Sequence, residues 1–136
     1  MDKKLLQAYT TAQYWIHEPK IIFGLGDMSD LLRNYLSWID CNRFAFITAY
    51  NPYSKGLSLG ENQKRNKSLL KDLSWYNMIN GAGWDLDGKR EPEESFLVCN
   101  INKDIANNLA KKYEQNALLY WDGWESIDLI TIEESI

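Results

Sequence analysis

In two stretches of the sequence, amides stand where an apolar pattern would otherwise continue. TAYNPYS (48–54) ends an apolar run with an asparagine, a proline and hydroxyls. Further on, two asparagines precede three leucines on one predicted helix face, at the spacing i, i+4, i+7, i+8 and i+11: Asn62, Asn66, Leu69, Leu70 and Leu73. A buried amide must be hydrogen-bonded or it costs roughly 1–3 kcal/mol. These amides therefore either protrude beyond the sheet or line a polar end of the core.

We expect the two stretches to meet, because ligand sites in sheet proteins often lie beyond the carboxyl ends of strands, where helices begin. Tyr50 or Tyr53 could form an aromatic wall there, and the amino terminus of the following helix would favour an anionic group. Amides bind by geometry, so a polar metabolite or nucleobase fits better than a metal. The predicted ligand cluster is Asn51, Ser54, Asn62 and Asn66. The alternative is an ordinary turn over 51–54, in which the proline presets the backbone angle.

Titratable residues supply one candidate for acid–base catalysis. Glu91, Glu93 and Glu94 follow a lysine and an arginine, a pattern more typical of a solvated loop than of paired catalytic carboxylates. Glu94 is the exception, because it touches the start of a buried strand. His17 is the only histidine of the chain, and the sequence supplies no partner that would make it a general base. We expect it at the surface or on an edge strand.

The remaining motifs predict no metal and no cofactor. DLDGKREPEE resembles a calcium loop, but aligning Gly88 with the obligatory glycine puts Gly83, which has no side-chain oxygen, at the first ligand position. GLG at 24–26 precedes a helix, yet Ser29 stands where a dinucleotide fingerprint needs its third glycine.

Composition limits the classes of partner. The net charge of -4 and pI near 5.0 lack the basic footprint of nucleic-acid binding, which depends on phosphate contacts. The apolar runs are too short for a membrane span, and the amino terminus does not resemble a signal peptide. Cys41 and Cys99 form no C-x-x-C motif and are interpreted as free thiols in a reducing compartment. We therefore predict a cytoplasmic protein with one domain over residues 1–136, of open oligomeric state.

The pattern of elements predicts an α+β fold with a mixed or antiparallel sheet and helices packed on it. Residues 11–23 read as an edge strand or two short strands, and helices are expected to about residue 39, over 61–76 and from residue 104. RFAFITAY and SFLVCNI read as buried strands. Hairpins are expected at Asp87-Gly88 and Asp122-Gly123. Residues 43–132 then follow a β-α-β-β-α-β-β order, close to a ferredoxin-like order with one added strand.

Several of these segments together resemble a family of small bacterial proteins, domain-of-unknown-function family 3293. The resemblance rests on TAYNPYS, on ESFLV (94–98) and on LAKKYEQNA (109–117), and spans roughly residues 43–122. It implies no activity, cofactor or catalytic residue. It implies a shared pattern that joins Asn51, Ser54, Asn62, Glu94 and Gln115. The stretch REPEES leaves open whether Glu91, Glu93 or Glu94 fills the family's acidic position.

Two functions follow as hypotheses. The first is the binding of a small polar ligand at the cluster of Asn51, Ser54, Asn62, Asn66, Glu94 and Gln115. The second is a non-catalytic protein-interaction or inhibitor module, favoured by the acidic balance, six tryptophans and eight tyrosines, because interface centres are rich in both aromatics. The two hypotheses can be distinguished by the exposure of four tryptophans, Trp75, Trp84, Trp121 and Trp124. A uniformly buried set would count against an aromatic docking face.

Overall fold

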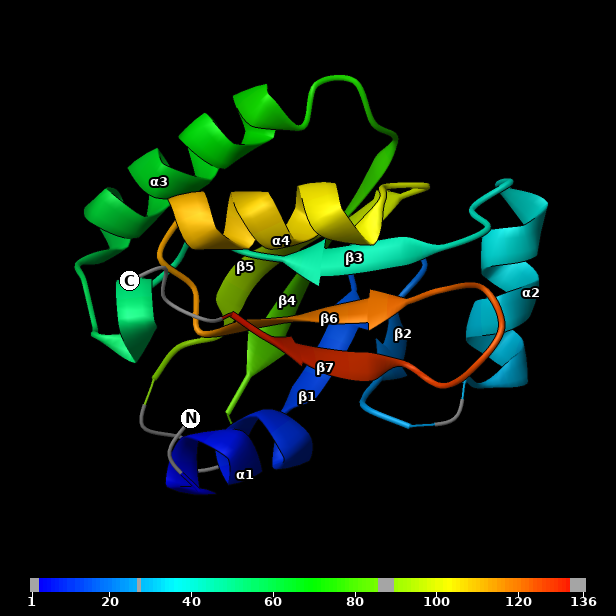
Figure 1. Cartoon of the computed structure of the whole chain (residues 1–136), viewed down its shortest axis with the longest axis horizontal. Coiled ribbons are helices and arrows are strands. Elements are labelled where there is room, and N and C mark those ends of the chain that lie inside the picture. Colours follow the sequence, from blue (N-terminus) through cyan, green and yellow to red (C-terminus); the bar gives the residue numbers. More distant parts are fainter. Residues whose placement is uncertain (1–2, 27, 86–89, 133–136) are drawn as a thin grey trace.

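The computed structural model describes residues 3–26, 28–85 and 90–132 (Figure 1). In chain order, the described elements are α1 (Lys3–Thr11), β1 (Gln13–Ile16), β2 (Ile21–Phe23), α2 (Asp30–Trp38), β3 (Phe44–Ile47), the 3-10 helix η1 (Pro52–Ser54), α3 (Leu59–Asp72), β4 (Met78–Trp84), β5 (Glu93–Cys99), α4 (Lys103–Lys112), β6 (Ala117–Trp121) and β7 (Asp128–Thr131). Every helix among them is too short or too polar to cross a membrane.

The strands form one antiparallel sheet in the order β2-β1-β4-β5-β3-β6-β7. Its middle part, β4-β5-β3-β6 with α3 and α4 as crossovers, has the predicted ferredoxin-like order, and β7 is the added strand. The hairpin of β1 and β2 extends the other edge, and the sheet curls along its width (Figure 1). The predicted α+β class is confirmed.

Helices cover both faces of the sheet. In β3, Phe44 and Phe46 pack with Leu32 and Leu36 of α2 on one face. Ala45 and Ile47, which alternate with them along the strand, pack on the other face, with α3 and α4. In Figure 1, α3 and α4 lie together above the sheet, whereas α1 and α2 lie elsewhere around it. A strand buried on both faces has no polar side, which is why FAFI reads as a continuous apolar run.

Side-chain caps fix where the main helices begin. Ser29 accepts a hydrogen bond from the Leu32 N–H at the start of α2, and Ser58 accepts one from the Glu61 N–H at the start of α3. The α3 helix therefore begins at residue 59 and ends at residue 72, short of the predicted residue 76. On its predicted apolar face, Leu70 is 42% exposed, so that part of the periodic pattern was wrong.

One element lies outside the expectations from sequence, because none was expected over α1. β4 supplies the second strand of the predicted β-α-β-β-α-β-β order and occupies a glycine-rich segment. A Cβ on Gly81 of β4 would overlap the carbonyl oxygen of Trp15 in β1, so glycine is needed for the two strands to approach. The Asp122-Gly123 hairpin is confirmed between β6 and β7. The proposed turn at Asp87-Gly88 lies outside the described residues.

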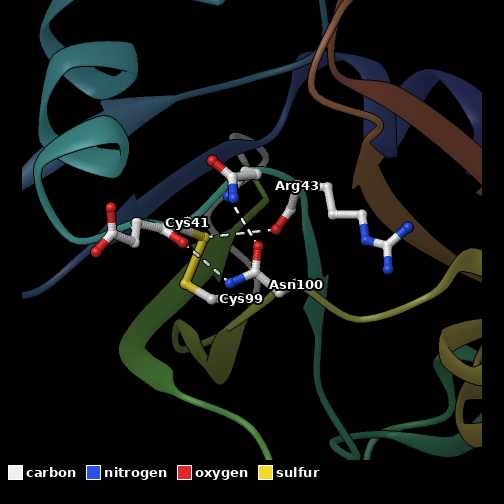
Figure 2. The surroundings of a disulfide bond; sticks show 6 residues. Cys41, Arg43, Cys99 and Asn100 are labelled. Atoms are coloured by element: carbon white, nitrogen blue, oxygen red, sulfur yellow. Dashed lines mark hydrogen bonds between the residues drawn. A yellow bond between two sulfur atoms is a disulfide. The ribbon is translucent and has the colours of Figure 1, made fainter.

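Cys41 and Cys99 are joined in a disulfide, so the prediction of free thiols is wrong (Figure 2). The antiparallel register of β3 and β5 brings the residues before β3 to the end of β5, and the two Cα atoms lie 5.1 Å apart. Asn100 strengthens the same junction, because its side chain accepts a hydrogen bond from the Asn42 N–H and donates one to the Asp40 carbonyl. This pairing depends on strand register, which the spacing of the cysteines does not show.

Candidate functional site

A cavity of about 260 Å³ lies between α1 and the sheet, at the end of β3 where the TAYNPYS segment begins. Its roof is a stripe of four half-buried residues at the helical spacing i, i+3, i+4 and i+7: Leu5, Ala8, Tyr9 and Ala12. No residue of α1 is fully buried. The helix therefore rests on the cavity rather than on a packed core. The sequence carried this signal in the spacing of the four residues.

Aromatic side chains form the apolar part of the cavity, and they are not the ones expected. Tyr14, Phe46 and Trp84 line it together with Tyr9 of the roof. Burial raises the pKa of both tyrosines, so both phenols stay neutral. The Tyr14 hydroxyl donates to the Tyr9 carbonyl over 2.8 Å and so ties α1 to β1. Tyr50 and Tyr53, which were expected as the aromatic wall, are not among the lining residues.

Four polar side chains form what we call the polar wall of the cavity: Asn51, Ser54, Glu93 and Gln115. Asn51 is the central residue of this polar wall. Its side-chain nitrogen donates to Oε2 of Glu93 over 2.9 Å, and its side-chain oxygen accepts from the Leu57 N–H over 3.0 Å. Ser54 accepts from the side chain of Asn116 over 3.0 Å. Three of the sequence-predicted residues, from the end of β3 and the start of β6, are thus brought together.

Asn62 and Asn66 lie behind the polar wall, outside the lining of the cavity. Both are buried and hydrogen-bonded. The Asn62 side chain accepts from the backbone N–H of Asn51 and donates to the Asn51 side chain, each over 2.8 Å. Asn66 accepts from the Ala49 N–H and donates to the Glu94 carbonyl, again over 2.8 Å. The amide stripe of α3 therefore forms a polar end of the core that fixes the backbone after β3.

Glu94, the predicted acid–base candidate, lies outside the cavity lining, and Glu93 lies within it. Glu94 Oε2 is 3.0 Å from Nε2 of His17, and the two side chains are 52% and 41% exposed. The structure thus supplies the partner of His17 that the sequence did not show, at the surface. Burial raises the pKa of Glu93, while the hydrogen bond from Asn51 and the charge of Arg90 act in the opposite direction.

Three further charged residues lie along the cavity, and we call them its rim: Asp85, Arg90 and Glu91. The amino terminus of α3 is capped by Ser58 and does not line the cavity, so its dipole is not directed at a ligand there. Among the described residues, no group of three or more His, Cys, Asp or Glu is arranged to hold a metal ion. Besides the charge of Arg90, the cavity therefore offers neutral amides, hydroxyls and carboxyl groups.

Comparison with known proteins gives one match. The model of the family described as "Protein of unknown function (DUF3293)" matches residues 47–118, just over half of the chain. This segment contains the whole polar wall and leaves the roof outside. No curated protein and no solved structure matches the chain.

Proposed function

The chain belongs to the DUF3293 family, and on that premise we propose that it binds a small polar ligand in the cavity between α1 and the sheet. The observation that carries the proposal is the hydrogen bond between Asn51 and Glu93 inside this cavity. A half-buried carboxyl group held by a neutral amide, beside open space, is a feature of sites more than of cores, because removing a carboxylate from water without a paired opposite charge is unfavourable.

The size and lining of the cavity support a metabolite-sized ligand. Ligand pockets typically enclose about 300–1,000 Å³ and combine apolar walls with a few placed polar groups. At about 260 Å³ this cavity is just below that range. Tyr14, Phe46 and Trp84 supply the apolar walls, and the polar wall supplies the groups that would orient the ligand.

The backbone of the NPYS segment supports a site over an ordinary turn. Asn51, Tyr53 and Ser54 adopt left-handed φ values of 50°, 50° and 63°. Non-glycine residues in this region cost on the order of 1–3 kcal/mol each and persist only where the surroundings hold them. The Tyr53 N–H donates to the Glu114 carbonyl over 2.6 Å, and the Ser54 N–H donates to the Asn51 carbonyl over 2.9 Å. This conformation turns Asn51 and Ser54 toward the cavity.

Native mass spectrometry of gently purified protein tests the proposal. We expect a small added mass on the wild-type chain. Glu93→Gln should lose it, and Glu94→Gln, the same change on the adjacent residue outside the cavity, should keep it. A bare 15.9 kDa chain from several hosts, or an adduct that both variants keep, would contradict the proposal.

A second function is favoured by one specific observation, the exposure of three tryptophans. Trp38, Trp75 and Trp124 are 81%, 92% and 87% exposed, whereas Trp121 is buried. The set is thus not uniformly buried, and the protein-interaction or inhibitor module stays open. A protein that co-purifies with the wild type, and is lost from Trp75→Ser and Trp124→Ser but not from Glu93→Gln, would favour it.

A cytoplasmic location is part of the proposal for the ligand-binding protein. The Cys41–Cys99 disulfide is the observation that opposes it, because disulfides persist mainly in oxidising compartments. Trapping thiols with an alkylating agent in intact cells before lysis tests the location. Two alkylated cysteines would support a cytoplasmic protein, and two unmodified ones would contradict it.

A further inference from the structure

The hydrogen bonds of the polar wall leave mainly acceptors for a ligand. The Gln115 side-chain nitrogen already donates twice, to the Tyr50 carbonyl over 3.0 Å and to the Tyr113 carbonyl over 3.1 Å. An amide nitrogen carries two hydrogens, so both are used. Gln115 therefore has only its carbonyl oxygen to offer to the cavity that it lines.

Glu93 leaves a second acceptor. Its Oε2 accepts from Asn51, and no hydrogen bond or salt bridge from a described residue reaches Oε1. The Asn51 side-chain oxygen is already occupied, because it accepts from Leu57 and Asn62. The remaining donor of the polar wall is the second amide hydrogen of Asn51, because the Ser54 hydroxyl is hydrogen-bonded to the side chain of Tyr9. No salt bridge joins a described residue to this carboxylate, although the charge of Arg90 acts on it.

The charged residues along the cavity favour a cationic ligand, as the free hydrogen-bond acceptors do. Asp85 and Glu91 line the cavity with Glu93, and Arg90 is the one basic residue among the described lining residues. A carboxylate removed from water is stabilised most by a charge-assisted hydrogen bond from a cation. A ligand that brings its own positive charge and its own hydrogens would therefore complete this wall.

We infer that the ligand is a protonated primary amine with a compact aromatic or aliphatic body. Its ammonium group donates to the acceptors of Glu93 and Gln115, and its body lies against Tyr14, Phe46 and Trp84. This inference rests on the proposed function and narrows it to one chemical class. The raised pKa of Glu93 agrees with it, because a bound ammonium would stabilise the charged form that burial disfavours.

Three probes of similar shape test the inference by calorimetry: phenethylamine, phenethyl alcohol and hydrocinnamate. They present an ammonium, a hydroxyl and a carboxylate on a phenyl body. We expect the wild type to bind the amine roughly ten- to hundredfold more tightly than the alcohol, the size of a charge-assisted hydrogen bond. Glu93→Gln should remove this preference, and Glu94→Gln should retain it. The wild-type comparison needs no variant, so it holds even where Glu93→Gln does not fold.

The two proposals fail in different ways. Equal or tighter binding of the alcohol or of hydrocinnamate, or no binding of the amine, overturns the amine inference. Native mass spectrometry decides the ligand site separately. An adduct without a basic nitrogen would overturn the inference and leave the site in place, whereas the absence of any adduct, together with no binding of the three probes, would overturn both.

Discussion

Glu93 and Glu94 are neighbours in β5 whose carboxyl groups have different partners in different places. Glu93 accepts a hydrogen bond from Asn51 inside the cavity, and Glu94 pairs with His17 near the surface. The cause is the alternation of side chains along a strand, which sends consecutive residues to opposite faces of a sheet. The two residues therefore provide a matched pair of variants, one inside the candidate site and one outside it.

Replacing Glu93 should change how stability depends on pH. Burial raises the pKa of Glu93 above its ordinary value of 4.5. The folded state then binds this proton more tightly than the unfolded state does, so the contribution to stability is present below pH 4.5 and is lost as the pH rises through the raised pKa. We expect the free energy of unfolding of the wild type, minus that of Glu93→Gln, to fall as pH rises. Urea titrations of both proteins from about pH 4 to about pH 8 measure it.

Glu94→Gln is the control for this experiment, because other titrating groups are shared by all three proteins. If its difference curve had the same slope as that of Glu93→Gln, the effect would belong to this part of β5 in general and not to the carboxyl group of Glu93.

Asn62→Leu should destabilise the protein. The substitution removes both hydrogen bonds between Asn62 and Asn51 and leaves a buried backbone N–H without its acceptor. Such a loss costs roughly 1–3 kcal/mol. Urea unfolding monitored by circular dichroism measures the change in the free energy of unfolding. A neutral or stabilising result would show that the amide stripe of α3 is not needed to fix the segment after β3.

Two adjacent leucines of α3 should differ strongly when each is replaced by alanine. Leu69 is completely buried, so Leu69→Ala should cost roughly 2–5 kcal/mol through the cavity it leaves. Leu70 is 42% exposed, and Leu70→Ala should cost well under half of that. Thermal and urea unfolding of the pair measure the difference. Equal losses would contradict the orientation of α3 on the sheet.

Sequence patterns predicted most of the fold, because the order of strands and helices between residues 43 and 132 restricts the sheet to few arrangements. They failed where a tertiary contact decides. The bounds of β4 were not predicted within its glycine-rich segment, since only the neighbouring strand shows why Gly81 must lack a side chain. The roof helix was missed because its stripe covers a cavity and contains no strongly apolar run.

The candidate site was predicted in part, for similar reasons. The asparagines were visible because a buried face of α3 begins with amides. Glu93 and Glu94 could not be told apart, because residues 95–99 of β5 are buried on both faces and show no alternation from which to read orientation. The cysteine pairing requires the register of β3 with β5 and is absent from any local pattern.

Breaking the Cys41–Cys99 disulfide should lower stability without changing the strand order. The cysteines are 58 positions apart, and closing a loop of that length removes unfolded-state entropy worth about 4 kcal/mol in the chain-entropy model. The double variant Cys41→Ser with Cys99→Ser should therefore unfold at lower urea concentration than the oxidised protein. The wild type treated with reductant is the control. Equal stability of oxidised and reduced protein would contradict a structural role for this bond.

The boundary of the family match runs through the lining of the cavity, so that one part of the lining belongs to the matched segment and another part does not. The polar wall lies within residues 47–118, whereas the helix α1 that covers it is built from residues 3–11, outside that segment. A chain of this family could therefore have a different segment in place of α1 and still have the polar wall. Relatives with the same polar groups would then bind different ligands, selected by the shape of the segment that stands in the place of α1.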